Sequence, residues 1–193
     1  MAAVPLSSAV MNVIKKIPTS LEGVFVLEPR VFGDDRGFFF ESYNERAMAE
    51  IGILERFVQD NHSCSACNVL RGLHYQIRQA QGKLVRVAEG EILDVAVDLR
   101  RSSPTFGDWA AARLSGENKH MLWIPPGFAH GFCVTSEKAH VLYKATDFYA
   151  PEHERTLAWN DPDLNIDWQL SGDPIVSAKD QRGVSLRQAE TFE

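Results

Sequence analysis

About eight short segments with the composition of β-strands follow one another between residues 56 and 149, and no helical pattern separates them. Turns rich in Gly, Pro, Asp and Asn divide the segments. The expected strands are RFVQDN, VLRGLHYQ, KLVRVAEG, EILDVAVDL, WAAARLS, HMLWIP, GFCVTS and HVLYKATDFY. A parallel sheet would need helical crossover connections, so this order predicts an all-β fold with a closed sandwich or jelly roll.

Two local patterns precede these strands. GVFVLEP and FFFESY are predicted to form a first hairpin across the turn GDDRG, whose glycines tolerate the φ angles of tight turns. NERAMAEIG is then expected to form a short helix capped by Asn44. The domain is therefore expected to be mostly β, with a few short helices.

In the segment EILDVAVDL, the side chains that point to one face of the expected strand differ in kind from those that point to the other face. One face of the expected strand carries Leu93, Val95, Val97 and Leu99. Asp94 and Asp98 fall on the other face. One side of this strand can then build core while the other side carries chemistry.

The size and charge of the chain limit its organisation and partners. With 193 residues, a single domain over residues 21–193 is expected, preceded by an N-terminal extension over residues 1–20 that could be disordered. The net charge is −6 and there is no basic stripe, so nucleic acid is not an expected partner. No apolar segment approaches the ~20 residues that span a bilayer, and no secretory signal is evident, so a cytoplasmic protein is expected.

The cysteines do not indicate a metal centre. Cys64 and Cys67 form a CxxC pattern, which could hold zinc or carry out redox chemistry. The chain has no second CxxC, and its odd number of thiols is typical of a reducing compartment. Two free thiols in a turn are the preferred interpretation.

The segment PPGFAH places His130 three residues after a glycine, at the expected start of a strand. This spacing is the second half of the cupin signature and indicates a cupin jelly roll. Metal-binding cupins bring an H-x-H pair in the first half, but the corresponding stretch here is His74-Tyr75-Gln76. Two histidines without a third ligand should hold a metal poorly, so acid and base side chains are preferred over metal chemistry.

A longer series of motifs resembles one enzyme family. In chain order the motifs are FGDDRGFFFESYN, FVQDNHS, VLRGLHYQ, QGKLVRV, GEILDVAVDLR, SPTFG, LWIPPGFAHGF, LYKATDFYAPEHE and SAKD. Over roughly residues 22–181 the chain resembles the dTDP-4-dehydrorhamnose 3,5-epimerases. The resemblance implies a jelly-roll homodimer with exchanged N-terminal strands and no cofactor. It also implies a dTDP-4-keto-6-deoxy sugar as substrate, inverted at C3 and C5 through an enolate.

The chemistry of that reaction matches residue types in the chain. A ketone at C4 acidifies the C–H bonds at C3 and C5, so inversion needs a base, an acid on the opposite ring face and a cation near the ketone oxygen. His74 is predicted as the base, because the reference pKa of imidazole, about 6.5, is close to neutral pH. The resemblance implies Asp180 as its partner, Tyr143 as the acid and Lys83 as the group that stabilises the enolate.

The resemblance also implies a set of substrate contacts. Arg71 and Arg36 match the positions that hold the diphosphate, and Tyr149 matches an aromatic side chain that stacks on thymine. Because of strand exchange, Arg36 and Glu41 could serve the site of the neighbouring subunit. The remaining predicted contacts are Glu41, Gln59, Asp60, Asn61, Lys83, His130, Glu154 and Lys179.

Three other functions stay open from the sequence alone. A relative that inverts one carbon, or that shifts the ketone, would share most of these residues. A non-catalytic cupin that binds sugar nucleotides would not need an opposed acid and base, and a metal-dependent cupin oxygenase would contain iron or manganese.

Gly72 raises a specific structural question. In a regular strand Arg71 and His74 point to opposite faces, yet the proposed chemistry brings both to one substrate. A bulge or kink at Gly72 is therefore predicted, since it would turn both side chains into the same cavity.

Overall fold

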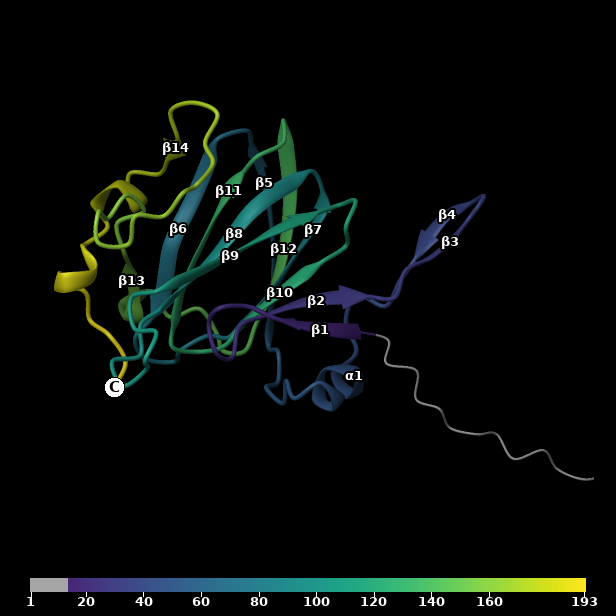
Figure 1. Cartoon of the computed structure of the whole chain (residues 1–193), viewed down its shortest axis with the longest axis horizontal. Coiled ribbons are helices and arrows are strands. Elements are labelled where there is room, and N and C mark those ends of the chain that lie inside the picture. Colours follow the sequence, from purple (N-terminus) through teal and green to yellow (C-terminus); the bar gives the residue numbers. More distant parts are fainter. Residues whose placement is uncertain (1–13) are drawn as a thin grey trace, which may run out of the picture.

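The computed structural model describes residues 14–193, which form two antiparallel sheets packed face to face, with one short α-helix (Figure 1). The predicted all-β jelly roll is confirmed. Of the predicted N-terminal extension, residues 1–13 lie outside the described part. Residues Ile14–Pro18 form strand β1 and pair with β2 (Phe25–Pro29).

The first sheet has six strands. Its order is β1, β2, β10 (Met121–Ile124), β7 (Lys83–Glu89), β12 (Lys138–Ala145) and β5 (Gln59–Ala66). The second sheet has the order β13 (Glu154–Thr156), β6 (Val69–Gln76), β11 (Phe128–Val134), β8 (Glu91–Asp98) and β9 (Trp109–Ser115), with β14 (Ile175–Val176) parallel to β6. Successive strands alternate between the two sheets from β5 to β8 and again from β9 to β12.

Apolar side chains are buried in three layers. The central core lies between the sheets and contains Val85 and Val141 from one sheet and Ala96 and Phe132 from the other. The outer face of the second sheet packs against the C-terminal segment, including Trp168. Helix α1 (Glu45–Glu50) and the loop after it cover part of the outer face of the first sheet. Three short 3₁₀ turns complete the chain: η1 (Pro151–His153), η2 (Asp180–Arg182) and η3 (Leu186–Gln188).

The helix was predicted correctly and the first hairpin was not. Asn44 caps α1, where its side chain accepts hydrogen bonds from the backbone N–H groups of Arg46 and Ala47. GVFVLEP does not pair with FFFESY, because β2 lies between β1 and β10 and has no free edge. Instead β3 (Phe32–Asp34) pairs with β4 (Gly37–Phe39) across the GDDRG turn, and this hairpin extends away from the barrel (Figure 1).

The two faces of β8 divide as predicted. The outer face of β8, which packs against the C-terminal segment, carries Leu93, Val95 and Val97, and Leu99 follows in the same cluster. Asp94 and Asp98 lie on the opposite face, which contributes Ala96 to the central core. Both faces are buried, so each aspartate needs partners.

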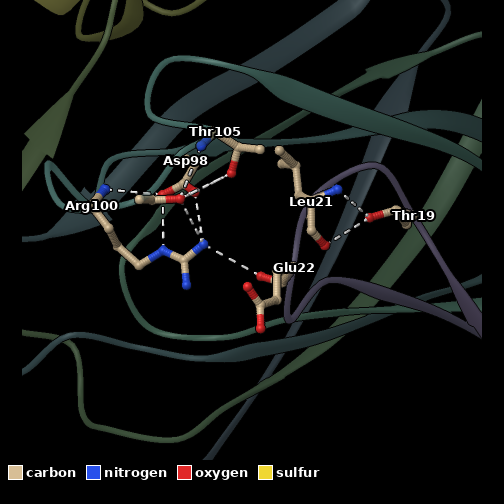
Figure 2. Close-up of polar contacts among 7 residues, drawn as sticks. Thr19, Leu21, Glu22, Asp98, Arg100 and Thr105 are labelled. Atoms are coloured by element: carbon tan, nitrogen blue, oxygen red, sulfur yellow. Dashed lines mark hydrogen bonds and ion pairs between the residues drawn. The ribbon is translucent and has the colours of Figure 1, made fainter.

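A polar network holds the carboxylate of Asp98. Arg100 donates from Nε at 2.9 Å, and Thr105 donates from Oγ1 at 2.8 Å (Figure 2). Burial alone would raise the pKa of Asp98, but these hydrogen bonds, with one from Ser103, lower it to about 2. Arg100 also lies over the ring of Phe128, the residue opposite Asp98 at the start of β11. The network thus anchors the strand that carries His130.

The predicted irregularity at Gly72 is confirmed. His74 pairs with His130 and Arg71 pairs with Phe132, so β6 advances three residues where β11 advances two. One residue of β6 is therefore extra, and Gly72 has φ +128°, in the region that favours glycine. As a result, Arg71 and His74 line the same cavity.

We expect Gly72→Ala to destabilise the protein by about 3 kcal/mol in urea unfolding. A Cβ at Gly72 would lie 2.5 Å from the Cα of Gly131 and 2.9 Å from the carbonyl oxygen of His130. Gly33→Ala is the matched control, since the nearest atom to its Cβ would be 3.7 Å away. Equal stability of the two variants would contradict the close approach of β6 and β11.

Candidate active site

A cavity of about 620 Å³ opens between the two sheets. Strands β5, β7 and β12 of the first sheet line it opposite β6 and β11 of the second, and residues 175–180 close one side. Nine predicted site residues line it: Arg71, His74, Lys83, His130, Tyr143, Tyr149, Glu154, Lys179 and Asp180.

His74 and Asp180 form a hydrogen-bonded pair. Nε2 of His74 lies 2.5 Å from Oδ1 of Asp180, although the two residues are 106 positions apart in the sequence. Burial raises the pKa of Asp180, but its hydrogen bond with His74 and further bonds from Ser177 and the Gly72 backbone hold it below its ordinary value. The pair fixes the ring and leaves Nδ1 without a hydrogen-bond partner among residues 14–193, so this nitrogen can accept a proton.

Lys83 is a buried cation in the same cavity. Burial lowers its pKa to about 8, and the nearby carboxylates of Asp94 and Glu154 partly oppose this effect. Its Nζ donates to the carbonyl oxygen of His74 at 3.4 Å. An ammonium group in a poorly solvated site interacts strongly with any negative charge that develops beside it.

A second histidine and aspartate pair, His130 and Asp94, interacts electrostatically with Lys83. Nε2 of His130 is 2.7 Å from Oδ1 of Asp94, and both side chains are buried. Burial lowers the pKa of His130 despite the opposing charge of Asp94. The Oδ2 atom of Asp94 has no hydrogen-bond partner in the described structure. The negative charge of Asp94 favours the protonated form of Lys83.

Tyr143 faces the cavity from the sheet opposite to His74. It lies on β12 in the first sheet, whereas His74 lies on β6 in the second. Burial raises the pKa of its phenol, and the positive charge of Arg71 works in the opposite direction. A phenol that stays protonated at neutral pH is a suitable proton donor.

Glu154 connects two groups at the cavity. Its Oε2 accepts a hydrogen bond from the hydroxyl of Tyr149 at 2.9 Å, and its Oε1 accepts one from Lys179 at 2.5 Å. Burial raises the pKa of Glu154, but these two hydrogen bonds bring it below its ordinary value. The three residues join the loop after β12 to the C-terminal segment.

Strand β5 supplies amides to an adjoining cavity. Gln59 and Asn61 line a space of about 270 Å³ that shares His74, Lys83 and Tyr143 with the main cavity. The Gln59 side chain accepts from the backbone N–H of Tyr149 at 2.9 Å and donates to Asn61 at 3.0 Å. These two amides therefore help to position Tyr149.

Three predicted contacts lie away from this cavity. Asp60 is on the outer face of the first sheet, paired with Lys144 at 2.6 Å. Arg36 is in the β3–β4 hairpin, where its side chain is 90% exposed and pairs with Asp34. Glu41 accepts a hydrogen bond from Asn44 before α1. Their binding roles stay predictions.

Sequence reasoning missed several residues that line the cavity. Ser63 could have been found, since it follows Gln59 and Asn61 at the spacing of one strand face. Phe132, Val176 and Ser177 carried no comparable signal, because only the folded chain brings their strands to the cavity.

The three cysteines, Cys64, Cys67 and Cys133, are free thiols. The predicted turn holds Cys67 but not Cys64, which lies in strand β5. Within residues 14–193, no three His, Cys, Asp or Glu side chains come together in an arrangement that could hold a metal ion. No helix in this range is long and apolar enough to cross a membrane.

Comparisons with known proteins agree on one family. The model of the dTDP-4-dehydrorhamnose 3,5-epimerase family matches residues 18–188. A protein of that name from Pseudomonas aeruginosa is 63% identical over 180 residues, which are 93% of this chain and 99% of the relative. A dTDP-4-dehydrorhamnose 3-epimerase of Streptomyces niveus is 37% identical over 89% of this chain and 84% of its own length.

A solved structure has a very similar fold. It is the dTDP-6-deoxy-D-glucose-3,5-epimerase of Legionella pneumophila in complex with dTDP-4-keto-L-rhamnose. The TM-score is 0.90 at 50% sequence identity, and the match covers 92% of this chain and 95% of that one.

We expect Glu154→Gln to lower the pKa of Tyr149. That pKa is raised chiefly because the phenol donates to the Glu154 carboxylate, which stabilises the protonated form. A neutral amide removes the negative charge, so the phenolate should form at lower pH. NMR titration of ¹³C-labelled tyrosine measures this, with Glu152→Gln as a control; an unchanged Tyr149 titration would contradict the hydrogen bond.

Proposed function

The chain belongs to the dTDP-4-dehydrorhamnose 3,5-epimerase family, and we propose that His74, Tyr143 and Lys83 carry out the epimerisation in the cavity between the two sheets. The reaction inverts C3 and C5 of dTDP-4-dehydro-6-deoxy-D-glucose and yields dTDP-4-dehydro-L-rhamnose. The arrangement of His74 and Tyr143 on opposite sheets of one cavity is the observation that carries the proposal.

His74 is the proposed base. It takes the proton from C5 and from C3 in turn. The electron pair of each broken C–H bond forms a C=C bond to C4, and the π pair of the ketone moves to its oxygen as the enolate forms. Asp180 orients the ring and stabilises the imidazolium produced by each proton capture.

Lys83 and Tyr143 complete each inversion. The Lys83 ammonium stabilises the negative charge on the enolate oxygen, and its pKa of about 8 keeps most of it protonated at neutral pH. Tyr143 then gives its proton to the opposite face of the carbon that lost one. Before the second inversion, the His74 imidazolium releases its proton to solvent and the Tyr143 phenolate takes one up. These steps use side chains of the protein and require no metal or organic cofactor.

The nucleotide contacts follow from the remaining cations and the aromatic side chain. Arg71 and Lys179 are the proposed ligands of the diphosphate, since both line the main cavity of an acidic protein. Tyr149 is the proposed stacking partner of thymine, placed by Gln59. Asn61, His130 and Glu154 are proposed to contact the sugar or the nucleotide.

We further propose that the active protein is a homodimer with exchanged N-terminal strands. The β3–β4 hairpin pairs only with itself in the described chain, and it exposes Phe38 and Phe39 at 60% and 70%. Strand β5 lies at the edge of the first sheet beside the site, so it offers a free edge to a partner strand. Exchange would bring Arg36 and Glu41 to the site of the neighbouring subunit.

The 3,5-epimerase of Pseudomonas aeruginosa is 63% identical to this chain and the 3-epimerase of Streptomyces niveus is 37% identical, which favours double over single inversion. A sugar-nucleotide sensor would not need His74 and Tyr143 on opposite walls. The nucleotide-linked substrate and the free thiols also support a cytoplasmic location.

Incubation with dTDP-4-keto-6-deoxyglucose in D₂O tests the base. The wild-type protein should incorporate deuterium at C3 and C5, and His74→Ala should abolish incorporation at both carbons. NMR of the recovered sugar measures the labelling. Exchange at the wild-type rate in His74→Ala would remove His74 as the base, and labelling at one carbon in the wild type would indicate a single epimerase.

Tyr143→Phe should separate proton removal from inversion. Without the phenol, His74 can still exchange the C–H protons, but the opposite face lacks its donor. We expect a loss of inversion of ~10² or more with a smaller loss of exchange. Equal losses of both would count against Tyr143 as the donor.

Mixing two impaired variants tests the exchange of strands. If Arg36 acts in the neighbouring site, a mixed dimer of Arg36→Ala and His74→Ala chains contains one intact site. Random reassociation makes half of the dimers mixed, so about a quarter of wild-type activity should return. No recovery in a mixture shown to contain mixed dimers would contradict the exchange.

A further inference from the structure

Strand β5 presents a row of polar side chains on its inward face: Gln59, Asn61, Ser63 and Ser65. Gln59 is occupied by Tyr149 and Asn61, and Ser65 accepts a hydrogen bond from Nε of Arg71 at 3.0 Å. By contrast, Oγ of Ser63 and Nδ2 of Asn61 are buried without a hydrogen-bond partner among residues 14–193.

These unpaired atoms need an explanation. A buried hydroxyl or amide without a partner costs stability, whereas an alanine or valine on the same strand face would not. Ser63 lines the main cavity together with His74, Lys83 and Tyr143. Asn61 lines the adjoining cavity, which shares His74, Lys83 and Tyr143 with the main cavity. A hydroxyl group of a ligand bound where the two cavities meet would be a partner for both atoms.

The order of residues along β5 indicates which hydroxyl this is. Asn61 is the cross-strand partner of Tyr143, the proposed proton donor at the reacting carbons. Ser65, at the other end, braces Arg71, the proposed ligand of the diphosphate. Ser63 lies between these two positions.

The substrate has its groups in the same order. The diphosphate is attached at C1, and both reacting carbons, C3 and C5, lie two bonds from C1. C2, which carries a hydroxyl, lies between C1 and C3, and the ring oxygen lies between C1 and C5. The C3 hydroxyl moves when C3 inverts, but C2 keeps its configuration throughout. Of the hydroxyl groups on the ring, the 2-hydroxyl is therefore the one that can keep a hydrogen bond to a fixed strand through both steps.

We propose that Ser63, assisted by Asn61, binds the 2-hydroxyl of the sugar and makes the enzyme selective against 2-deoxy sugars. This rests on the proposed function, in particular on the placement of Tyr143 and Arg71. The contact fixes the position of the sugar ring between the diphosphate site and the catalytic side chains.

The test combines Ser63→Ala with removal of the hydroxyl from the substrate. Steady-state kinetics would compare dTDP-4-keto-6-deoxyglucose with its 2-deoxy analogue. With the 2-hydroxy sugar, Ser63→Ala should lower kcat/KM by about 3- to 10-fold, mainly through KM. With the 2-deoxy analogue the substitution should change kcat/KM less than 2-fold, because the contact is already absent.

Cys64→Ala is the matched control, because Cys64 is the next residue on β5 and is exposed on its outer side. It should leave the kinetics of both substrates unchanged. Ser63→Cys, which keeps the shape but weakens the hydrogen bond, gives the same comparison if Ser63→Ala folds poorly.

Two outcomes overturn the inference. An equal loss with both substrates would show that Ser63 only supports the strand, and no loss with either would show that it makes no contact. Failure of the proposed function is distinguishable, because the wild-type protein would then incorporate no deuterium from D₂O into either substrate.

Discussion

The close approach of β6 and β11 is the constraint on which the rest of the site depends. Gly72 and Gly131 lie opposite each other where one extra residue enters β6, and a Cβ at either position would collide with the other strand. The resulting bulge turns Arg71 and His74 into one cavity and sets His74 beside His130. In a regular ladder Arg71, the predicted ligand of the diphosphate, would point away from His74, the predicted base.

Electrostatics in this cavity depend on burial as much as on pairing. Burial raises the pKa of Asp180 and Glu154, yet each carboxyl has enough hydrogen-bond donors to be held below its ordinary value. Among residues 14–193, Lys83 donates one long hydrogen bond, to the carbonyl oxygen of His74, and burial dominates its pKa. The site therefore keeps ionised carboxylates around a buried cation that is still mostly protonated at neutral pH, which suits a reaction whose intermediate is an anion.

Local features of the fold could be predicted because few residues determine them. The Asn44 cap and the short helix depend on neighbours within one turn, and the alternation of β8 depends only on the strand period. The first hairpin was mispredicted because pairing is a competition among distant strands: β1 and β10 occupy both edges of β2, and the turn instead joins β3 to β4.

The sequence by itself determined the β architecture, the chemical groups of the site and, through the order of its motifs, the family. The resemblance implied Asp180 as the partner of His74, but spacing alone could not show that the two meet across 106 residues. Nor did the sequence show that Asp60 points to the outer face while Asn61 points inward. It also gave no sign that Ser63 and Asn61 carry buried polar atoms without partners. Only the tertiary structure decided these points, because hydrogen bonding and burial depend on which distant strands become neighbours, whereas period and composition are properties of each segment alone.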